Sequence, residues 1–332
     1  MDKSQKIIEI KDLQTSFYTL EGELKAVSGL SCHVYKGESV GLVGESGCGK
    51  SACAMSILRL IPNPPGRIVG GEILFQEHDL LKLSEREMRQ IRGNRIAMIF
   101  QEPSSSLNPV LTVKQQIFET LKLHRGLDDG QCLEETVRLL RLVGIPDPQL
   151  RVNDYPFQFS GGMRQRIMIA MALSCRPELL IADEPTTSLD VTVQAQLMEL
   201  IDGLRKTFGT SVILITHNLG LVARYVDRVS VMYAGRMAEI APTDELFENP
   251  AHPYTQGLLA SVPRLDAGRQ KSLRGIKGQP PNLTRLPDGC SFHPRCEYAR
   301  DICEKEYPPL EKIGEEHYRA CFLEPGELKK PR

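Results

Sequence analysis

The sequence predicts an α/β fold in which strands and helices alternate around a layered core, and three observations predict it. An apolar run at 39–43 enters a glycine-rich loop, and an apolar helix leaves that loop. Strand-like runs at 179–182 and 211–216 are separated by residues at helical spacing. From about 104 to 176 the pattern is helical, which indicates a helical subdomain inserted into the core.

The first elements follow from local signals. Strands at 7–13 and 23–34 precede the glycine-rich loop, and the helix after it stops at the proline-rich stretch 61–65. A strand resumes at 70–75. Ser84 and Glu87 form a capping-box pattern that opens a short helix to Arg92.

The later elements follow from hydrophobic spacing. The continuous apolar run 96–100 predicts a buried strand that ends at Gln101. Two amphipathic helices are each followed by a glycine suited to ending a helix: Leu133, Val137, Leu140 and Val143 before Gly144, and Val193, Leu197, Leu200 and Leu204 before Gly209.

Length and composition set the broad class. The 332 residues suffice for a large domain, expected at 1–264, and a proline-punctuated, irregular C-terminal appendage, expected at 265–332. Apolar residues at 41% and charged residues at 25% are typical of a soluble protein. The net charge of −1 gives no reason to expect nucleic acid as a partner. Because no apolar run is long enough to span a bilayer and no signal-peptide core precedes the first strand, we expect a cytoplasmic chain.

The glycine-rich loop carries the most specific motif, since 44–51 fits G-x-x-x-x-G-K-[ST]. Its glycines let successive backbone amides turn toward an anion, and the helix that follows directs its positive dipole end at the same place. Lys50 suits the β- and γ-phosphates, and Ser51 suits Mg²⁺. The nucleotide-binding residues expected here are Gly44, Glu45, Ser46, Gly47, Cys48, Gly49, Lys50, Ser51 and Ala52.

Two further segments suit the same chemistry. The apolar strand at 179–182 ends in Asp183 and Glu184, which can serve as a metal-binding acid and a base for water, or can simply form a solvated strand end. Ser160, Gly161 and Gly162 start a helix and can bind an anion, although a plain helix cap explains them as well.

In this order, the motifs resemble those of the ATP-binding subunits of ABC transporters. The matches are 44–51 to the Walker A loop, Gln101 to the Q-loop, 159–165 to the signature motif, Asp183 and Glu184 to Walker B, 188–190 to the D-loop and His217 to the switch histidine. The signature departs from the usual pattern, with Phe159 for Leu and with Met163 and Arg164 before Gln165. The resemblance implies a RecA-like core with a β-subdomain and an inserted helical subdomain.

A narrower resemblance is to the oligopeptide/dipeptide importer ATPases, a group that includes nickel importers. Residues 101–109, 159–166 and 252–259 carry it. It implies an ATPase that couples ATP hydrolysis to peptide uptake, with nickel uptake as the alternative. A soluble ABC ATPase of DNA repair or translation is a further alternative, but such proteins carry two cassettes or long coiled coils. A binding-only regulatory subunit is disfavoured by the presence of Glu184 and His217.

The resemblance also assigns roles. Lys50 would hold the β- and γ-phosphates, Glu184 would be the general base, and His217 would contact the γ-phosphate. Ser51 and Gln101 would bind Mg²⁺ directly, and Asp183 would do so through water. Phe17 or Tyr18 would stack on adenine.

The partners follow from the same resemblance. Ser160, Gly161, Gly162 and Asp190 would face ATP bound by a second, paralogous ATPase subunit in a head-to-tail heterodimer. Two transmembrane permease subunits would hold this pair at the cytoplasmic face of the membrane, and an extracytoplasmic peptide-binding protein would act indirectly.

Four of the nine cysteines, Cys290, Cys296, Cys303 and Cys321, lie near the C-terminal end. Four thiolates can bind Zn²⁺ or an iron–sulfur cluster. Successive cysteines have 5, 6 and 17 residues between them, so the set includes no close pair of the kind zinc favours. This favours a cluster, and the family resemblance implies [4Fe–4S]; zinc and unliganded thiols remain alternatives.

Overall fold

The computed structural model describes residues 2–102, 106–187, 189–261, 275–324 and 326–328. Its contacts divide the chain into two compact units: unit 1 comprises 1–7, 34–39 and 82–215, and unit 2 comprises 8–33, 40–81 and 216–332. Among the described residues, no helix combines the length and apolar character needed to cross a membrane.

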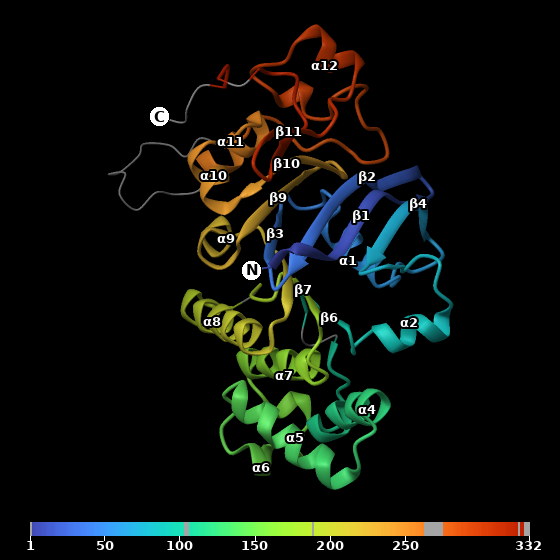
Figure 1. The fold of residues 1–332 in the computed structure, drawn as a ribbon, viewed down its shortest axis with the longest axis vertical. Helices are drawn as coiled ribbons and strands as arrows, with labels where there is room; N and C mark the ends of the chain where they lie inside the picture. The colour runs from blue at the N-terminus through green and yellow to red at the C-terminus, as the bar shows by residue number, and fades with distance from the viewer. Residues whose placement is uncertain (1, 103–105, 188, 262–274, 325, 329–332) are drawn as a thin grey trace. The chain divides into compact units, whose positions relative to one another are not determined.

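Unit 1 combines a short parallel sheet with helices (Figure 1). Strands β8, β7 and β6 pair in that order, with Ile181 opposite both Met98 and Ile213. All three strands are fully buried, which explains their continuous apolar sequences. The elements are α2 (Glu85–Ile91), β6 (Ile96–Ile99), α4 (Val113–Arg125), α5 (Asp129–Leu142), α6 (Pro148–Arg151), η1 (Pro156–Gln158), α7 (Gly161–Leu173), β7 (Leu179–Asp183), α8 (Val191–Phe208) and β8 (Ser211–Ile215).

The helical subdomain predicted from sequence corresponds to α4–α7, which form one group in Figure 1. Capping explains several of its boundaries. Thr112 and Asp128 each form a capping box at the start of α4 and α5. Gly144, with φ 76°, follows the end of α5, as the sequence predicts. The predicted first residue, 104, lies outside the described residues.

Unit 2 contains two sheets. In the first, the order is β2-β1-β4-β5; in the second, β3 pairs in parallel with β9, and β9, β10, β12 and β11 follow in antiparallel pairs. The elements lying wholly or mainly in this unit are β1 (Asp2–Thr19), β2 (Gly22–Lys36), β3 (Ser39–Val43), α1 (Lys50–Ile57), β4 (Gly66–Phe75), β5 (His78–Asp79), α9 (Leu219–Tyr225), β9 (Arg228–Tyr233), β10 (Arg236–Pro242), α10 (Thr243–Glu248), α11 (Pro253–Ala260), η2 (His293–Arg295), α12 (Asp301–Lys305), β11 (Glu311–Gly314) and β12 (His317–Arg319).

The first strand is longer than the predicted 7–13. Its pairing with β4 shifts register between Lys11 and Thr15, and Asp12 has a φ of 47°. The strand therefore continues beyond an irregularity that interrupts the apolar alternation and hides its second half from sequence analysis.

The C-terminal segment is more regular than the predicted appendage. β12 pairs with β10 through Glu239↔Arg319 and Ile240↔Tyr318, and β11 pairs with β12. Phe292 and Leu323 are buried. The prediction of an irregular segment is therefore wrong for residues 311–319, because strands this short show no recognisable period. The predicted boundary at 265 lies outside the described residues.

Candidate functional site

The loop between β3 and α1 contains three positions whose backbone conformation favours glycine. Gly44, Gly47 and Gly49 have φ values of 154°, 78° and 106°. A Cβ at Gly44 would lie 2.2 Å from the Met232 carbonyl oxygen, and one at Gly49 would lie 2.0 Å from the Ala26 carbonyl oxygen. The glycines are therefore required both for the turns and for close approach to neighbouring strands.

Lys50 holds the two ends of this loop together. Its ammonium donates to the carbonyl oxygens of Gly44 at 2.8 Å and Glu45 at 2.9 Å, and the residue is 6% exposed. Gly49 caps α1 without a side-chain hydrogen bond, and no acidic residue lies in the first turn. The loop thus presents a lysine and a helix N-terminus, which suits a phosphate group.

Glu45 differs from the other residues of the predicted nucleotide site. Its N–H donates to the Tyr254 hydroxyl at 2.8 Å, and its carboxylate accepts two hydrogen bonds from Arg295. This side chain is therefore directed to the chain's own C-terminal region, a pairing that the sequence motif does not indicate.

A second set of polar groups lies in unit 1, where β6 and β7 end. These strands are parallel neighbours, so Gln101 and Asp183–Glu184 follow them at the same edge of the sheet. The Glu184 Oε2 atom accepts hydrogen bonds from Gln101 Nε2 at 3.0 Å and from Thr187 Oγ1 at 2.8 Å. The structure thus brings the predicted base and the predicted Q-loop residue together.

Thr187 was not predicted from sequence. Its only local signal is a hydroxyl three residues after the acidic pair. Glu184 has a left-handed backbone, with a φ of 45°, which is costly for a residue with a side chain. Such a conformation is typical of functional sites, where surrounding contacts hold it.

The start of α7 is positioned by Ser160, whose side chain accepts from the Met163 N–H at 3.3 Å. Nothing lies within 4 Å of a Cβ built on Gly161, so this helix start is open. Gln165 is buried and donates to the Pro185 carbonyl at 2.6 Å. The displaced glutamine of the signature motif therefore connects α7 to the segment just after Glu184.

The remaining predicted residues occupy varied positions. Asp190 caps α8, accepting from the Val193 N–H at 3.0 Å, whereas position 188 lies outside the described residues. His217 is exposed, just before Asn218, the cap of α9. Tyr18 is 53% exposed, and the half-buried Phe17 ring lies close enough to Gly66 to leave no room for a Cβ there.

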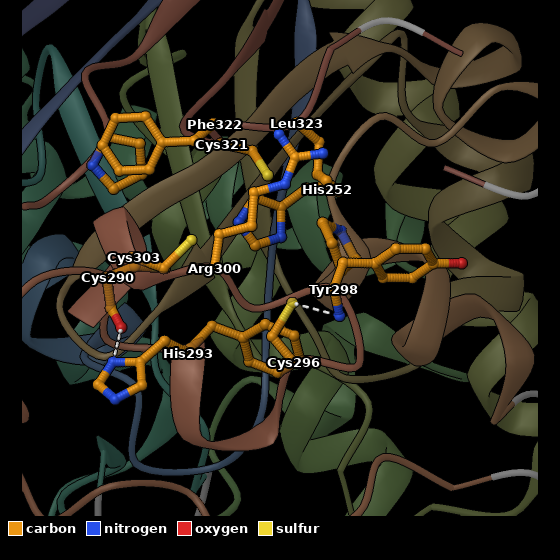
Figure 2. Close-up of a pocket in the computed structure, with 13 residues that line it drawn as sticks. His252, Cys290, His293, Cys296, Tyr298, Arg300, Cys303, Cys321, Phe322 and Leu323 are labelled. Atoms are coloured by element: carbon orange, nitrogen blue, oxygen red, sulfur yellow. Dashed lines mark hydrogen bonds between the residues drawn. The ribbon is translucent and has the colours of Figure 1, made fainter. Parts of the chain in front are cut away.

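The four C-terminal cysteines line one pocket (Figure 2). Burial is the main cause that raises the pKa values of Cys290 and Cys296 to about 11, and it also raises the pKa of Cys321. The His293 Nδ1 atom forms a hydrogen bond with the Cys290 carbonyl oxygen at 3.0 Å. The four cysteines thus border one common cavity.

The fit to a metal is incomplete. The cavity between these residues measures about 20 Å³, room for about one water molecule. Within the described part of the chain, no three or more His, Cys, Asp or Glu side chains are arranged to hold a metal ion. The donor set suits zinc or iron, but the thiols as placed do not form a ready metal site.

Comparison with protein families gives two matches. A model described as "ABC transporter" matches residues 27–187, and one described as "Oligopeptide/dipeptide transporter, C-terminal region" matches residues 238–303. Two curated relatives from Bacillus subtilis are similar over nearly their whole length. The oligopeptide transport ATP-binding protein is 51% identical (97% of this chain, 90% of that protein), and the dipeptide transport ATP-binding protein is 50% identical (96% and 95%).

Solved structures agree on the fold. The dimeric post-hydrolysis state of an ATP-binding cassette bound to ADP and Pi matches with a TM-score of 0.64 and 25% identity, covering 71% of this chain and 98% of that chain. A dimeric bacterial ABC transporter cassette matches with a TM-score of 0.63, 26% identity and the same coverage. The ABC ATPase cassette fold is therefore confirmed, whereas the irregular, Cys-rich C-terminal appendage is not supported.

Proposed function

The chain belongs to the ABC transporter ATP-binding proteins, in the group with the oligopeptide/dipeptide C-terminal region, and we propose that it hydrolyses ATP to drive peptide import through separate membrane subunits. The observation that supports this proposal is the similarity, over nearly the full length, to two peptide-transport ATP-binding proteins. The chain also contains Lys50, Gln101 and Glu184 in the ATP-binding motifs. Both relatives are named for peptides, which favours peptides over nickel.

In this proposal, Lys50 exchanges its carbonyl partners for the β- and γ-phosphates, because an ammonium attracts an anionic phosphate oxygen more strongly than a neutral carbonyl oxygen. Residues 44–52 supply amides to the phosphates, and His217 contacts the γ-phosphate. The adenine stacks on Phe17 or Tyr18.

Glu184 is the general base for the attacking water. The hydrogen bonds from Gln101 and Thr187 fix its carboxylate, so that its second oxygen accepts the proton from water. Gln101 donates through its amide nitrogen, which leaves its amide oxygen for Mg²⁺. Ser51, Gln101 and Asp183 together offer the oxygen ligands that Mg²⁺ prefers, and the ion would neutralise phosphate charge.

A second subunit completes the site. The open start of α7, at Ser160, Gly161 and Gly162, binds the γ-phosphate of ATP held by a paralogous partner, and Asp190 contacts that partner. The dimeric solved relatives support pairing of this kind. Two permease subunits hold the pair at the cytoplasmic face of the membrane, and an extracytoplasmic binding protein delivers the peptide.

Cys290, Cys296, Cys303 and Cys321 would be the ligands of a metal centre, either an iron–sulfur cluster or a single zinc ion, although the described side chains do not form a ready metal site. Its role would be to order the C-terminal segment, because metal binding supplies folding free energy. Anaerobic purification followed by absorbance spectra and iron, sulfide and zinc analysis distinguishes the two. Absence of all three elements leaves the thiols unliganded and removes the metal from the proposal.

Reconstitution tests the transport function. The chain, its paralogous ATPase and two permeases in proteoliposomes should import labelled di- or oligopeptide only with ATP, and Glu184→Gln should stop uptake. Nickel uptake without peptide uptake would show that the substrate is nickel rather than peptide. ATP hydrolysis by a chain that never associates with permeases would favour a soluble ABC ATPase.

A further inference from the structure

The phosphate loop contains a carboxylate. Glu45 lies directly after the first loop glycine, and its side chain is only 24% exposed. A triphosphate carries several negative charges, and like charges a few ångströms apart repel strongly where water is partly excluded. An unpaired Glu45 would therefore oppose the binding of the nucleotide that the loop exists to hold.

Arg295 neutralises this carboxylate. Its Nη1 donates to Glu45 Oε2 at 2.6 Å and its Nη2 donates to Oε1 at 3.0 Å, the paired geometry that guanidinium groups form best. The two residues are 250 positions apart in sequence. A guanidinium stays protonated in proteins, so Arg295 places a permanent positive charge beside the Glu45 carboxylate.

Arg295 is itself held in place. Its Nε donates to the Lys277 carbonyl at 2.9 Å, its Nη1 also reaches the Tyr233 hydroxyl at 3.3 Å, and its Nη2 reaches the Gly278 carbonyl at 3.4 Å. The side chain is 6% exposed. Because all three guanidinium nitrogens form hydrogen bonds, the group is held in one position, and its positive charge stays next to the Glu45 carboxylate.

The same region also holds the Glu45 backbone. The Tyr254 hydroxyl, which accepts from the Glu45 N–H, belongs to a fully buried ring packed 4.5 Å from Tyr233 and 5.4 Å from Phe292, centroid to centroid. The Glu45 carbonyl accepts from Lys50. Residues after 230 thus fix both the conformation and the charge of the phosphate loop.

We infer that Arg295 is a positioning residue for ATP: it cancels the Glu45 charge and fixes the start of the phosphate loop, so that the C-terminal region sets the affinity of the cassette for nucleotide. The inference rests on the proposed function, since it requires ATP to bind at this loop. Arg295 lies between Cys290 and Cys296, in η2.

A charge-pair cycle on the full-length chain tests the inference. Fluorescent ATP is titrated, with Mg²⁺, into the wild-type chain, Arg295→Gln, Glu45→Gln and the double variant. Arg295→Gln should weaken ATP binding on the order of tenfold, because the carboxylate is left unpaired. In the ATPase assay with the partner cassette, KM should rise by a similar factor while kcat changes little.

The double variant separates charge from folding. Glu45→Gln added to Arg295→Gln should recover most of the lost affinity, because no carboxylate remains to repel phosphate. The matched control is Arg89→Gln, whose exposed ion pair with Glu85 on α2 does not involve the loop; it should bind ATP like the wild type. If Arg295→Gln does not fold, Arg295→Lys should give an intermediate affinity.

Two outcomes overturn the inference: Arg295→Gln binding ATP as tightly as the wild type, or a double variant as weak as Arg295→Gln. Failure of the wild-type chain to bind ATP is a different result, since it refutes the proposed function itself.

Discussion

Gln101 donates a hydrogen bond of 3.0 Å from its side-chain amide to the carboxylate of Glu184, 83 residues later. The two residues follow neighbouring parallel strands, β6 and β7, and so meet at one edge of the sheet. Because Glu184 also accepts from Thr187 and has a left-handed backbone, its carboxylate is held at a single orientation. In the proposed mechanism, this arrangement would let the half-buried Glu184 act as a directed base rather than as a solvated charge.

We expect Glu184→Gln to lower ATP hydrolysis by about 100-fold or more while ATP still binds, because an amide cannot take a proton from water. Turnover is measured with the partner cassette and Mg²⁺, and binding is measured by fluorescent-nucleotide titration. Glu199→Gln, at an exposed position of α8, serves as the control. Hydrolysis near the wild-type rate would remove Glu184 from the base role.

Thr187→Val should lower kcat several-fold without changing ATP affinity, because it removes the hydroxyl that donates to Glu184 while keeping the side-chain shape. Thr187→Ser retains the hydroxyl and should restore most of the rate. A Thr187→Val variant that turns over at the wild-type rate would exclude a contribution of this hydrogen bond, and an equal loss in both variants would show that the hydroxyl alone is not sufficient.

Lys50→Ala should weaken ATP binding by about tenfold or more, since a charge-assisted contact to phosphate is lost. It should also loosen the loop, because Lys50 bonds the Gly44 and Glu45 carbonyl oxygens. Titration with fluorescent ATP measures the effect, with the exposed Lys206→Ala as control. Equal affinity in the two variants would contradict the assigned role.

Local chemistry explains which parts of the fold were predictable. The capping box of Ser84 and Glu87 and the helix end at Gly209 involve residues a few positions apart, and the structure confirms both. The buried strands β7 and β8 were also predicted within one residue, because a continuous apolar run of that length has few alternatives.

Long-range pairing explains what sequence could not predict. β12 forms by pairing with β10, and the side chain of His317 on β12 forms a hydrogen bond of 2.8 Å with the buried Glu239 carboxylate. The Arg295–Glu45 pair likewise joins residues far apart in the chain. The sequence around Glu45 gives no local signal of Arg295, and the sequence around Arg295 gives none of Glu45. The cysteine spacing therefore predicted a shared pocket, but it could not predict that the C-terminal region contacts the phosphate loop.

Replacing each candidate adenine-stacking ring should distinguish Phe17 from Tyr18. The residue that stacks on adenine should weaken ATP binding several-fold when changed to Ala, because ring stacking contributes about 1 kcal/mol. The other should leave affinity close to wild type, although Phe17→Ala also removes packing against Gly66 and should lower thermal stability. Wild-type affinity in both variants would exclude stacking by either ring.

Glu135→Gln should destabilise the helical subdomain at neutral pH by about 1 to 2 kcal/mol. Hydrogen bonds from Arg138 and then Arg125 lower the pKa of Glu135 from its ordinary value of 4.5 to about 2, and Arg125 lies on α4 whereas Glu135 lies on α5. A lowered pKa stabilises the fold above the unfolded value, and this contribution is lost as pH falls from about 4.5 toward 2. Urea unfolding between pH 7 and pH 3 should therefore show a gap between wild type and variant that narrows with acid, whereas the exposed Glu134→Gln should show none. A gap that stays constant across this range would mean that packing, and not the ion pairs, accounts for the loss.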